Sequence, residues 1–330
     1  MIDPMHHLKH FCHMAAACLA LSFAGTATAQ APAYPSKPIK FIVPFGPGGG
    51  NDLLARITAQ KLAESMGQPV VVENRVGASG VVGNQFLIRS APDGYTIIIG
   101  GTPLTVNQTL QRDMPYDALK DFSPISLLVL QPNVLIINPK VPANSLQELI
   151  ALAKAQPGRL NYGVGSEGSA PHLASELLKV MAGIDAVHVP YSGNAPMLNA
   201  VMSGEVTFGF DQPATALGFI QAGRVRALGV TSTTRSQVLP NIPTMSEAGL
   251  PGYEINSWFG ILGPPNLPKP IAERLSAEFA KALANPEVRE RLIQQGFTVV
   301  GSTPDQFAAH LKADVANWKR IIESSKMKIK

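Results

Sequence analysis

The sequence predicts an α/β protein built from two lobes, and three observations support this prediction. Short β-branched runs alternate with helical patterns along the chain after residue 35, which is typical of α/β proteins with largely parallel sheets. The chain contains two similar strand–loop–helix junctions, at 43–51 and at 189–195. In both, Val-Pro-aromatic precedes a loop of small residues. The length of 330 residues also favours two domains over one.

In the first part of the chain, hydrophobic periodicity and turn residues place the elements. Leucines and an isoleucine recur at helical spacing after Asn51 and Asp52, either of which can be the N-cap, and Gly67 ends the helix. The predicted strands are 39–43, 70–72, 95–99 and 134–137, and the predicted helices are 51–66 and 82–90.

The second part of the chain continues the alternation and then becomes helical. Ser145 and Glu148 form a capping box at the start of a helix that ends near 157–158. Residues 240–252 are rich in Pro and Gly and are predicted to be a linker. Further predicted strands are 160–164, 186–189, 206–210 and 227–231, and further helices are 171–181, 195–202, 214–221, 268–284, 286–295 and 304–325.

The N-terminus resembles a secretory signal peptide. Lys9 precedes an apolar run at 14–24, which is too short to span a bilayer because a spanning helix needs about 20 residues. An A-x-A cleavage signal at 27–29 follows. We therefore predict that residues 1–29 are removed, that translation starts at Met1 or Met5, and that the mature protein is periplasmic.

Composition excludes several classes of protein. Both cysteines, Cys12 and Cys18, lie in the predicted signal, so the mature chain would have neither disulfides nor thiol chemistry. Ala15 stands where lipidation of Cys18 would need a leucine-like residue. The net charge of +4 comes without a Lys/Arg run, which argues against nucleic-acid binding. A soluble monomer is expected.

A glycine-rich loop, Phe45 to Asp52, joins the first strand to the first helix. Its glycines, Gly48, Gly49 and Gly50, let a ligand approach the backbone, and the helix N-terminus offers unpaired N–H groups to an anion. A Walker loop would need Lys after the last glycine, where Asn51 stands, and a dinucleotide loop would need a third glycine there. A carboxylate cradle and an ordinary capped turn remain equally good interpretations.

A second polar loop, 163–169, precedes another predicted helix. Ser166 and Ser169 offer hydroxyls, and Gly168 with its neighbours offers N–H groups. Neither serine has glycines two residues before and two after it, so the hydrolase elbow is missing. His172 would fall in the first helical turn, where the macrodipole disfavours a charged imidazole. We interpret it as a neutral packing or capping residue.

The remaining candidates are weaker. Asp211 follows a predicted strand and either reaches a cleft or caps the next helix. Phe45, Tyr191 and Trp258 are aromatic candidates for a cleft, although each alone is more often a core residue. The histidines outside the signal are far apart and lack metal-ligand spacing, so neither a metal nor a cofactor is predicted.

Several segments together resemble the Bug/TctC family of tripartite tricarboxylate transporter receptors. The resemblance runs in order along the mature chain, through 35–39, 43–52, 73–80, 91–95, 162–172, 189–196, 223–231, 243–247 and 258–264. One departure is Asn51, which stands where the family often has Thr or Ser before the Asp.

The resemblance implies a two-lobe clamshell like a type II periplasmic binding protein. Lobe 1 would hold 36–130 and 254–330, and lobe 2 would hold 131–253. A small carboxylate, such as a di- or tricarboxylate, an aromatic acid or an acidic amino acid, would lie between the first loop and the loop Tyr191–Ala195. The candidate ligand-binding residues are Phe45, Gly48, Gly49, Gly50, Asn51, Asp52, Ser166, Gly168, Ser169, Tyr191, Gly193, Asn194, Ala195 and Asp211.

The family also implies a partner and a division of labour. A membrane permease of large and small subunits, TctA/TctB-like, would receive the ligand, and the receptor itself would not be an enzyme. Two alternatives stay open at this point. A sensory receptor for a membrane histidine kinase would have the same fold and ligand chemistry, and an exported serine hydrolase would use Ser166 or Ser169.

Overall fold

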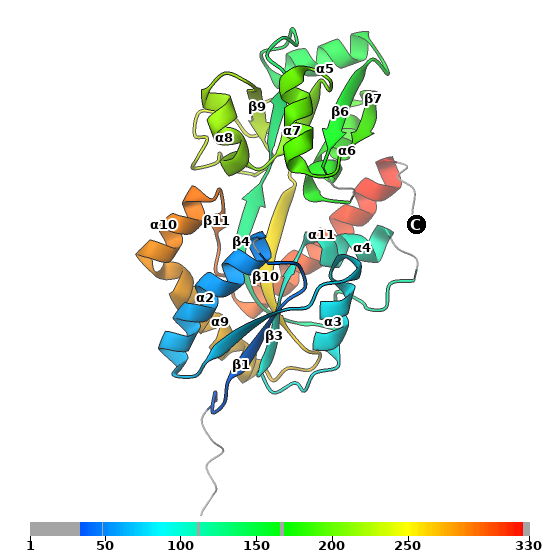
Figure 1. Cartoon of the computed structure of the whole chain (residues 1–330). Helices are drawn as coiled ribbons and strands as arrows, with labels where there is room; N and C mark the ends of the chain where they lie inside the picture. Colours follow the sequence, from blue (N-terminus) through cyan, green and yellow to red (C-terminus); the bar gives the residue numbers. More distant parts are fainter. Residues whose placement is uncertain (1–33, 48, 111–112, 166–167, 326–330) are drawn as a thin grey trace, which may run out of the picture. The chain divides into compact units, whose positions relative to one another are not determined.

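The computed structural model describes residues 34–47, 49–110, 113–165 and 168–325 (Figure 1). The predicted signal peptide, both cysteines, Gly48 and Ser166 lie outside these residues. Lys37–Lys330 form one unit, which holds two separate sheets.

The first sheet is mixed, with its parallel part at one side. Its order is β11-β4-β10-β3-β1-β2. β1 pairs in parallel with β2 and β3, whereas β10 runs antiparallel to β3 and β4, and β11 runs antiparallel to β4. The bounds are β1 Ile39–Val43, β2 Val70–Asn74, β3 Thr96–Gly101, β4 Ser123–Pro132, β10 Asn256–Gly263 and β11 Thr298–Val299.

The second sheet repeats this plan in the order β7-β6-β8-β5-β9. β6 is parallel to β7 and β8, and β5 is antiparallel to β8 and β9. The bounds are β5 Val134–Ile137, β6 Leu160–Val164, β7 Ala186–Pro190, β8 Phe208–Asp211 and β9 Arg226–Val230. The expectation of largely parallel sheets is therefore wrong, because an apolar strand pattern does not reveal the direction of its neighbour.

The chain passes between the two sheets twice. It leaves the first sheet through Asn133, between β4 and β5, and returns through 231–255, between β9 and β10. The returning segment includes the predicted linker, which forms no helix or strand and only one isolated bridge, between Val230 and Thr244. The long strands β4 and β10 are neighbours in the first sheet and connect it to the second.

Each predicted helix is present, with ends within about two residues of the predicted ones, the uncertainty normal for helix ends. In the first part the helices are α2 Gly50–Met66, the 3₁₀ turn η1 Ala78–Gly80, α3 Val81–Ile88 and α4 Thr102–Leu110, of which η1 and α4 were not predicted. Around the second sheet they are α5 Leu146–Ala155, α6 Ala170–Ala182, α7 Asn194–Ser203 and α8 Pro213–Gln221. The C-terminal helices are α9 Lys269–Ala284, α10 Pro286–Gln294 and α11 Pro304–Ser325.

Local signals explain several helix ends. Ser145 Oγ accepts a hydrogen bond from the Glu148 N–H at 3.2 Å, and the Glu148 carboxylate accepts from the Asn144 N–H at 2.7 Å. The predicted capping box is thus present, although its return bond reaches Asn144 rather than Ser145. Gly67 ends α2 with φ = 67°, a left-handed conformation that favours glycine.

α11 joins the hydrophobic cores of both sheets. Phe307 and Leu311 at its start belong to a buried cluster with Trp258 and Leu262 of the first sheet. Trp318, Ile321 and Ile322 near its end belong to a cluster formed mainly by residues of the second sheet and its helices. The C-terminal segment therefore does not pack on one sheet alone.

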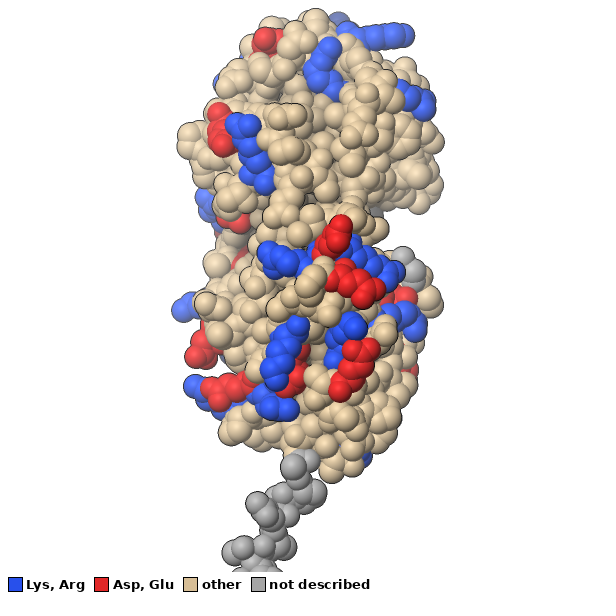
Figure 2. Space-filling model, turned by 90° about the vertical axis from the view of Figure 1, so that its left-hand side faces the viewer, with Lys and Arg blue, Asp and Glu red and all other residues tan. Residues whose placement is uncertain are grey.

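The surface carries mixed charge. Figure 2 shows Lys, Arg, Asp and Glu side chains intermingled on one face, without a large area of one sign. Ion pairs such as Lys61–Glu64 on α2 and Lys281–Glu278 on α9 have both signs side by side. Within the described part of the chain, none of the helices has the length and apolarity needed to cross a membrane.

Candidate functional site

A cavity of about 240 Å³ lies where several helices begin. Five of the described helices contribute residues from their N-terminal ends: Asn51 of α2, Thr102 and Pro103 of α4, Ser169–Pro171 of α6, Asn194 of α7 and Gln212 before α8. The strand β10 completes the wall with Ser257, Trp258 and Phe259, and Phe45, Gly101 and Gly168 also line the cavity.

The topology explains why these helix ends meet. α2 follows β1, α4 follows β3, α6 follows β6, α7 follows β7 and α8 follows β8. Ligands of open α/β sheets bind outside the carboxyl ends of such strands. The cavity combines this edge of the first sheet with the corresponding edge of the second.

The electrostatics of the cavity favour an anion. None of the described residues that line it is an Asp, Glu, Lys, Arg or His. Its polar groups are backbone amides, the amides of Asn51, Asn194 and Gln212, and hydroxyls. The first N–H groups of a helix have no partner within the helix, and each helix end carries a positive partial charge. Among the described lining residues, the hydrogen-bond donors are thus neutral, and together they suit a carboxylate.

Asp211 lies behind this wall and holds two of its members. The side chain is fully buried, and its Oδ1 accepts from Asn194 Nδ2 at 3.2 Å and from the Gln212 N–H at 2.8 Å. Its Oδ2 is buried without a hydrogen-bond partner. Burial raises the pKa of the Asp211 carboxyl to about 6, although the two hydrogen bonds oppose this shift. Asp211 orients cavity residues rather than capping α8, whose N-cap is Gln212.

Asp52 has a structural role in holding the glycine-rich loop. Its carboxylate forms an ion pair with Arg56 at 2.9 Å and accepts from Asn74 Nδ2 at 3.0 Å. The same Asn74 amide donates to the Phe45 carbonyl at 3.0 Å. Asp52 therefore fixes the glycine-rich loop to the end of β2, and it does not line the cavity.

The loop after β7 contributes its backbone rather than its aromatic ring. The Tyr191 hydroxyl donates to Glu205 at 2.8 Å, and the ring does not line the cavity. Gly193 has φ = 153°, a conformation that disfavours a side chain, and Asn194 follows as the first residue of α7. Gly49 instead has the ordinary extended values φ = −79° and ψ = 172°. The backbone of Gly49 therefore adopts a conformation that is open to any residue.

The predicted site residues fall into three groups. Phe45, Asn51, Gly168, Ser169 and Asn194 line the cavity. Gly49, Gly50, Asp52, Tyr191, Gly193, Ala195 and Asp211 belong to the same loops and strand ends but do not line it. Gly48 and Ser166 lie outside the described residues.

The sequence reasoning missed α4 and β10 and, with them, much of the cavity. The missed lining residues are Gly101, Thr102, Pro103, Ala170, Pro171, Gln212, Ser257 and Phe259, whereas Trp258 was considered as a cleft aromatic. A usable signal for α4 was the pair Thr102-Pro103 directly after a strand, because Pro is common in the first turn of a helix. β10 carries no comparable signal.

Of the two serines considered for a hydrolase, Ser169 lies in the described part of the chain and Ser166 does not. Ser169 is the N-cap of α6, and the nearby His172 accepts the Gly168 N–H through Nδ1 at 3.0 Å. An imidazole that accepts at Nδ1 is neutral, as predicted, and this nitrogen is already engaged by the backbone. The described residues also contain no cluster of three or more His, Cys, Asp or Glu side chains able to hold a metal.

Comparison with known proteins connects this geometry to a family. The family model "Tripartite tricarboxylate transporter family receptor" (TctC) matches residues 54–327. The BugT protein of Bordetella pertussis is 37% identical over 306 residues, which cover 92% of this chain and 94% of BugT.

Two solved structures with bound acids are also similar. "R. palustris Rpa4515 with adipate" has a TM-score of 0.75 and 35% identity, covering 89% of this chain and 99% of that one. "MatC (Rpa3494) from Rhodopseudomonas palustris with bound malate" has a TM-score of 0.70 and 31% identity, covering 88% and 100%. The fold is thus that of the periplasmic solute-binding proteins, and the chain belongs to the TctC family of tripartite tricarboxylate transporter receptors.

Proposed function

We propose that this protein captures a small organic acid in the cavity at the five helix N-termini and delivers it to a membrane permease of large and small subunits. The observation that carries the proposal is the convergence of helix N-termini on a cavity whose described lining residues include no charged side chain. A carboxylate there would accept charge-assisted hydrogen bonds, each worth about 1.5–3 kcal/mol. Helix N-termini would add about 0.3–2 kcal/mol each.

The chemistry of the cavity and that of the similar proteins support the same ligand class. Adipate and malate, bound in two solved structures similar to this chain, are both dicarboxylates. Backbone donors recognise any carboxylate, so the class follows from the helix ends. The apolar and aromatic wall of Phe45, Trp258 and Phe259 then selects the rest of the molecule. Non-enzymatic capture, rather than covalent chemistry, fits the neutral lining.

The proposal includes two lobes, a periplasmic location and a monomer. Lobe 1 would hold 36–130 and 254–330 and lobe 2 would hold 131–253, with the cavity between them and the residues Phe45 to Asp52 and Tyr191 to Asp211 as its two halves. The packing of the end of α11 against the core of the second sheet modifies this division, since 318–322 would move with lobe 2. Cleavage after residue 29 would release the protein into the periplasm.

Thermal-shift screening of purified protein against di-, tri- and aromatic carboxylates tests the proposal. A ligand at 100 times its dissociation constant stabilises the folded state by about 2.7 kcal/mol. Stabilisation by at least one acid, with none by the corresponding amide, is the expected outcome. A panel without any stabilising acid, at concentrations up to about 10 mM, would count against the proposal, because a dissociation constant at that limit corresponds to a binding free energy of only about 2.7 kcal/mol.

We expect the lobes to approach one another when the ligand binds. Asn51 and Thr102 lie after strands of one sheet, and Ser169 and Asn194 lie after strands of the other, so one ligand must draw both sets together. Small-angle scattering should show a smaller radius of gyration at saturating ligand. An unchanged radius at saturation would mean that the site is preformed or lies in one lobe.

A further inference from the structure

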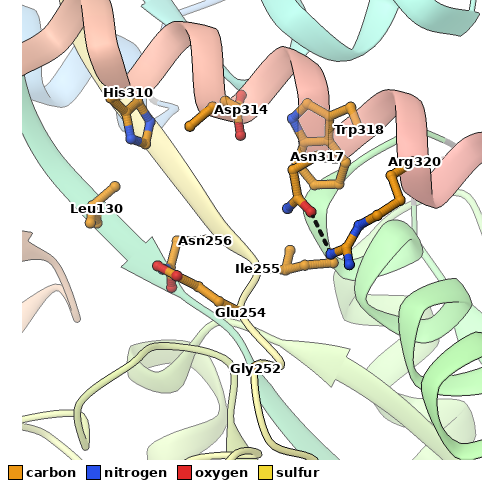
Figure 3. A pocket seen from close by; sticks show the side chains of 11 residues that line it. Leu130, Gly252, Glu254, Ile255, Asn256, His310, Asp314, Asn317, Trp318 and Arg320 are labelled. Carbon is orange, nitrogen blue, oxygen red and sulfur yellow. Dashed lines mark hydrogen bonds between the residues drawn. The ribbon is translucent and has the colours of Figure 1, made fainter.

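A second cavity lies between β10 and α11. It measures about 280 Å³ and shares no lining residue with the first, the ligand cavity. Asn256 of β10 lines the second cavity, whereas the next three residues, Ser257 to Phe259, line the first. Figure 3 shows His310, Asp314 and Trp318 on one face of α11, opposite Glu254 and Asn256. β10 is therefore a shared wall.

Asp314, which lines the second cavity, is hydrogen-bonded to residues of the ligand cavity and its surroundings. Its Oδ2 accepts from the Trp258 indole Nε1–H at 2.8 Å and from the Thr105 hydroxyl at 2.6 Å. Trp258 is fully buried and lines the ligand cavity. Thr105 is buried in the first turns of α4, whose residues Thr102 and Pro103 line the same cavity. One carboxylate oxygen thus holds two parts of the ligand site from outside it.

A further hydrogen bond ties these two parts to one another. The Trp258 backbone N–H donates to the Thr102 hydroxyl at 3.2 Å. Asp314, Trp258, Thr102 and Thr105 therefore form a small network between α11, β10 and α4. Removal of its central acceptor would cost the buried indole N–H its hydrogen bond, whereas the Thr105 hydroxyl also lies 3.0 Å from the Thr102 carbonyl and can donate there.

Among the described residues, neither Asp314 nor Glu254 belongs to an ion pair. Burial raises the pKa of Asp314, while hydrogen bonds from Thr105 and Trp258, the Trp318 indole and the charge of His310 lower it. Burial lowers the pKa of His310, although the nearby Asp314 carboxylate opposes this shift. The donors that reach Asp314 are mainly those of the ligand-site network.

We infer that Asp314 is a positioning residue: from α11 it fixes the Trp258 ring and the first turns of α4, and so sets the shape of the ligand cavity without touching the ligand. The inference rests on the proposed function for the part that concerns ligand affinity. The other part of the inference, that Asp314 fixes the Trp258 ring, can be tested without ligand.

Asp314→Asn tests the inference because Asn keeps the shape and removes the charged acceptor. Trp258 and Trp318 are the two tryptophans of the sequence, so the protein has two indole N–H signals in a proton–nitrogen spectrum. Trp258→Phe assigns one of them. In Asp314→Asn we expect the Trp258 signal to move and its N–H to exchange faster with solvent. Glu323→Gln, at an exposed position of the same helix, is the matched control and should leave the signal in place.

Affinity is measured by calorimetry with adipate and malate as probes, well below the melting temperature of each variant. Asp314→Asn should weaken binding of the better probe by about tenfold, which is about 1.4 kcal/mol. Trp258→Phe should weaken it similarly, and the double variant should lose less than the sum of the two, because one change weakens and the other removes the same hydrogen bond. A merely structural role would lower stability and leave affinity unchanged.

The outcomes separate the inference from the proposed function. An unmoved Trp258 signal in Asp314→Asn overturns the inference, and so does full affinity or strict additivity in the double variant. If the wild-type protein binds neither probe, the proposed function has failed for these acids. The indole signal still decides whether Asp314 positions Trp258.

Discussion

Gly165→Ala is expected to weaken ligand binding by at least about thirtyfold, roughly 2 kcal/mol. Gly165 directly follows β6, and a Cβ there would lie 2.6 Å from both the Asn194 nitrogen and the Gly193 carbonyl carbon. These are backbone atoms at the start of α7, so they cannot rotate away as a side chain would. The methyl group must push the N-terminus of α7, and Asn194 with it, out of the cavity wall. Stability should also fall by about 1–3 kcal/mol, as in other overpacked sites.

Gly218→Ala provides the control for the Gly165 variant. Gly218 lies inside α8, and a Cβ there meets no atom within 4 Å. Alanine should therefore raise stability by up to about 1 kcal/mol through helix propensity, without an effect on affinity. Calorimetric titration and melting curves of both variants check the prediction. Wild-type affinity in a folded Gly165→Ala protein would show that the position of Asn194 does not matter for binding.

Asp211→Asn should stabilise the protein at pH 7.5 by about 2 kcal/mol and remove part of its pH dependence. The carboxyl has a pKa of about 6 in the folded protein against 3.8 for a free aspartate side chain. The folded state therefore binds this proton more tightly, and the contribution of Asp211 to stability is greatest below pH 4 and is lost as the pH rises from about 4 to 6. Asparagine keeps the Oδ1 acceptor for Asn194 and Gln212 but has no charge to bury.

The same linkage predicts how binding depends on pH. A carboxylate held at Asn194 and Gln212 would place a second negative charge near Asp211 and raise its pKa further. Binding should therefore tighten as the pH falls from 8 to about 6, and this trend should disappear in Asp211→Asn. Asp185→Asn, at an exposed aspartate of the same sheet's periphery, is the matched control and should change neither property. A stability curve of Asp211→Asn that parallels the wild-type curve between pH 4 and 8 would contradict the assignment.

Local patterns in the sequence predicted most of the helices and the strands that precede them. Ile39–Val43 and Leu160–Val164 have the predicted bounds, because each is a short segment with buried apolar residues that is followed by a loop containing glycines. The strand β10, Asn256–Gly263, escaped prediction because it follows a long irregular segment and contains two glycines. The mixed strand directions could not be predicted either, since they follow from the two passages of the chain between the sheets.

The sequence predicts most of the helix N-termini that contribute to the candidate site, but it does not predict the strand that lines the rest of the cavity. The loops before α2, α6 and α7 carried glycines and small polar residues at strand–helix junctions, which are visible in the sequence. The wall from Ser257 to Phe259 comes from a strand more than two hundred residues after Phe45. Asp52 and Asp211 each stand where a predicted strand is followed by a predicted helix, so the sequence does not distinguish their roles. In the structure Asp52 forms an ion pair with Arg56, whereas burial raises the pKa of Asp211.

The most direct test of the central claim is calorimetric titration of the wild-type protein with the best-binding carboxylic acid and with its amide. We predict that the acid binds at least about a hundredfold more tightly, roughly 2.7 kcal/mol, since each charge-assisted bond to a helix N–H exceeds a neutral one by about 1 kcal/mol or more. Equal affinity for acid and amide, or saturable binding of neutral molecules alone, would contradict the claim that the converging helix N-termini form a carboxylate site.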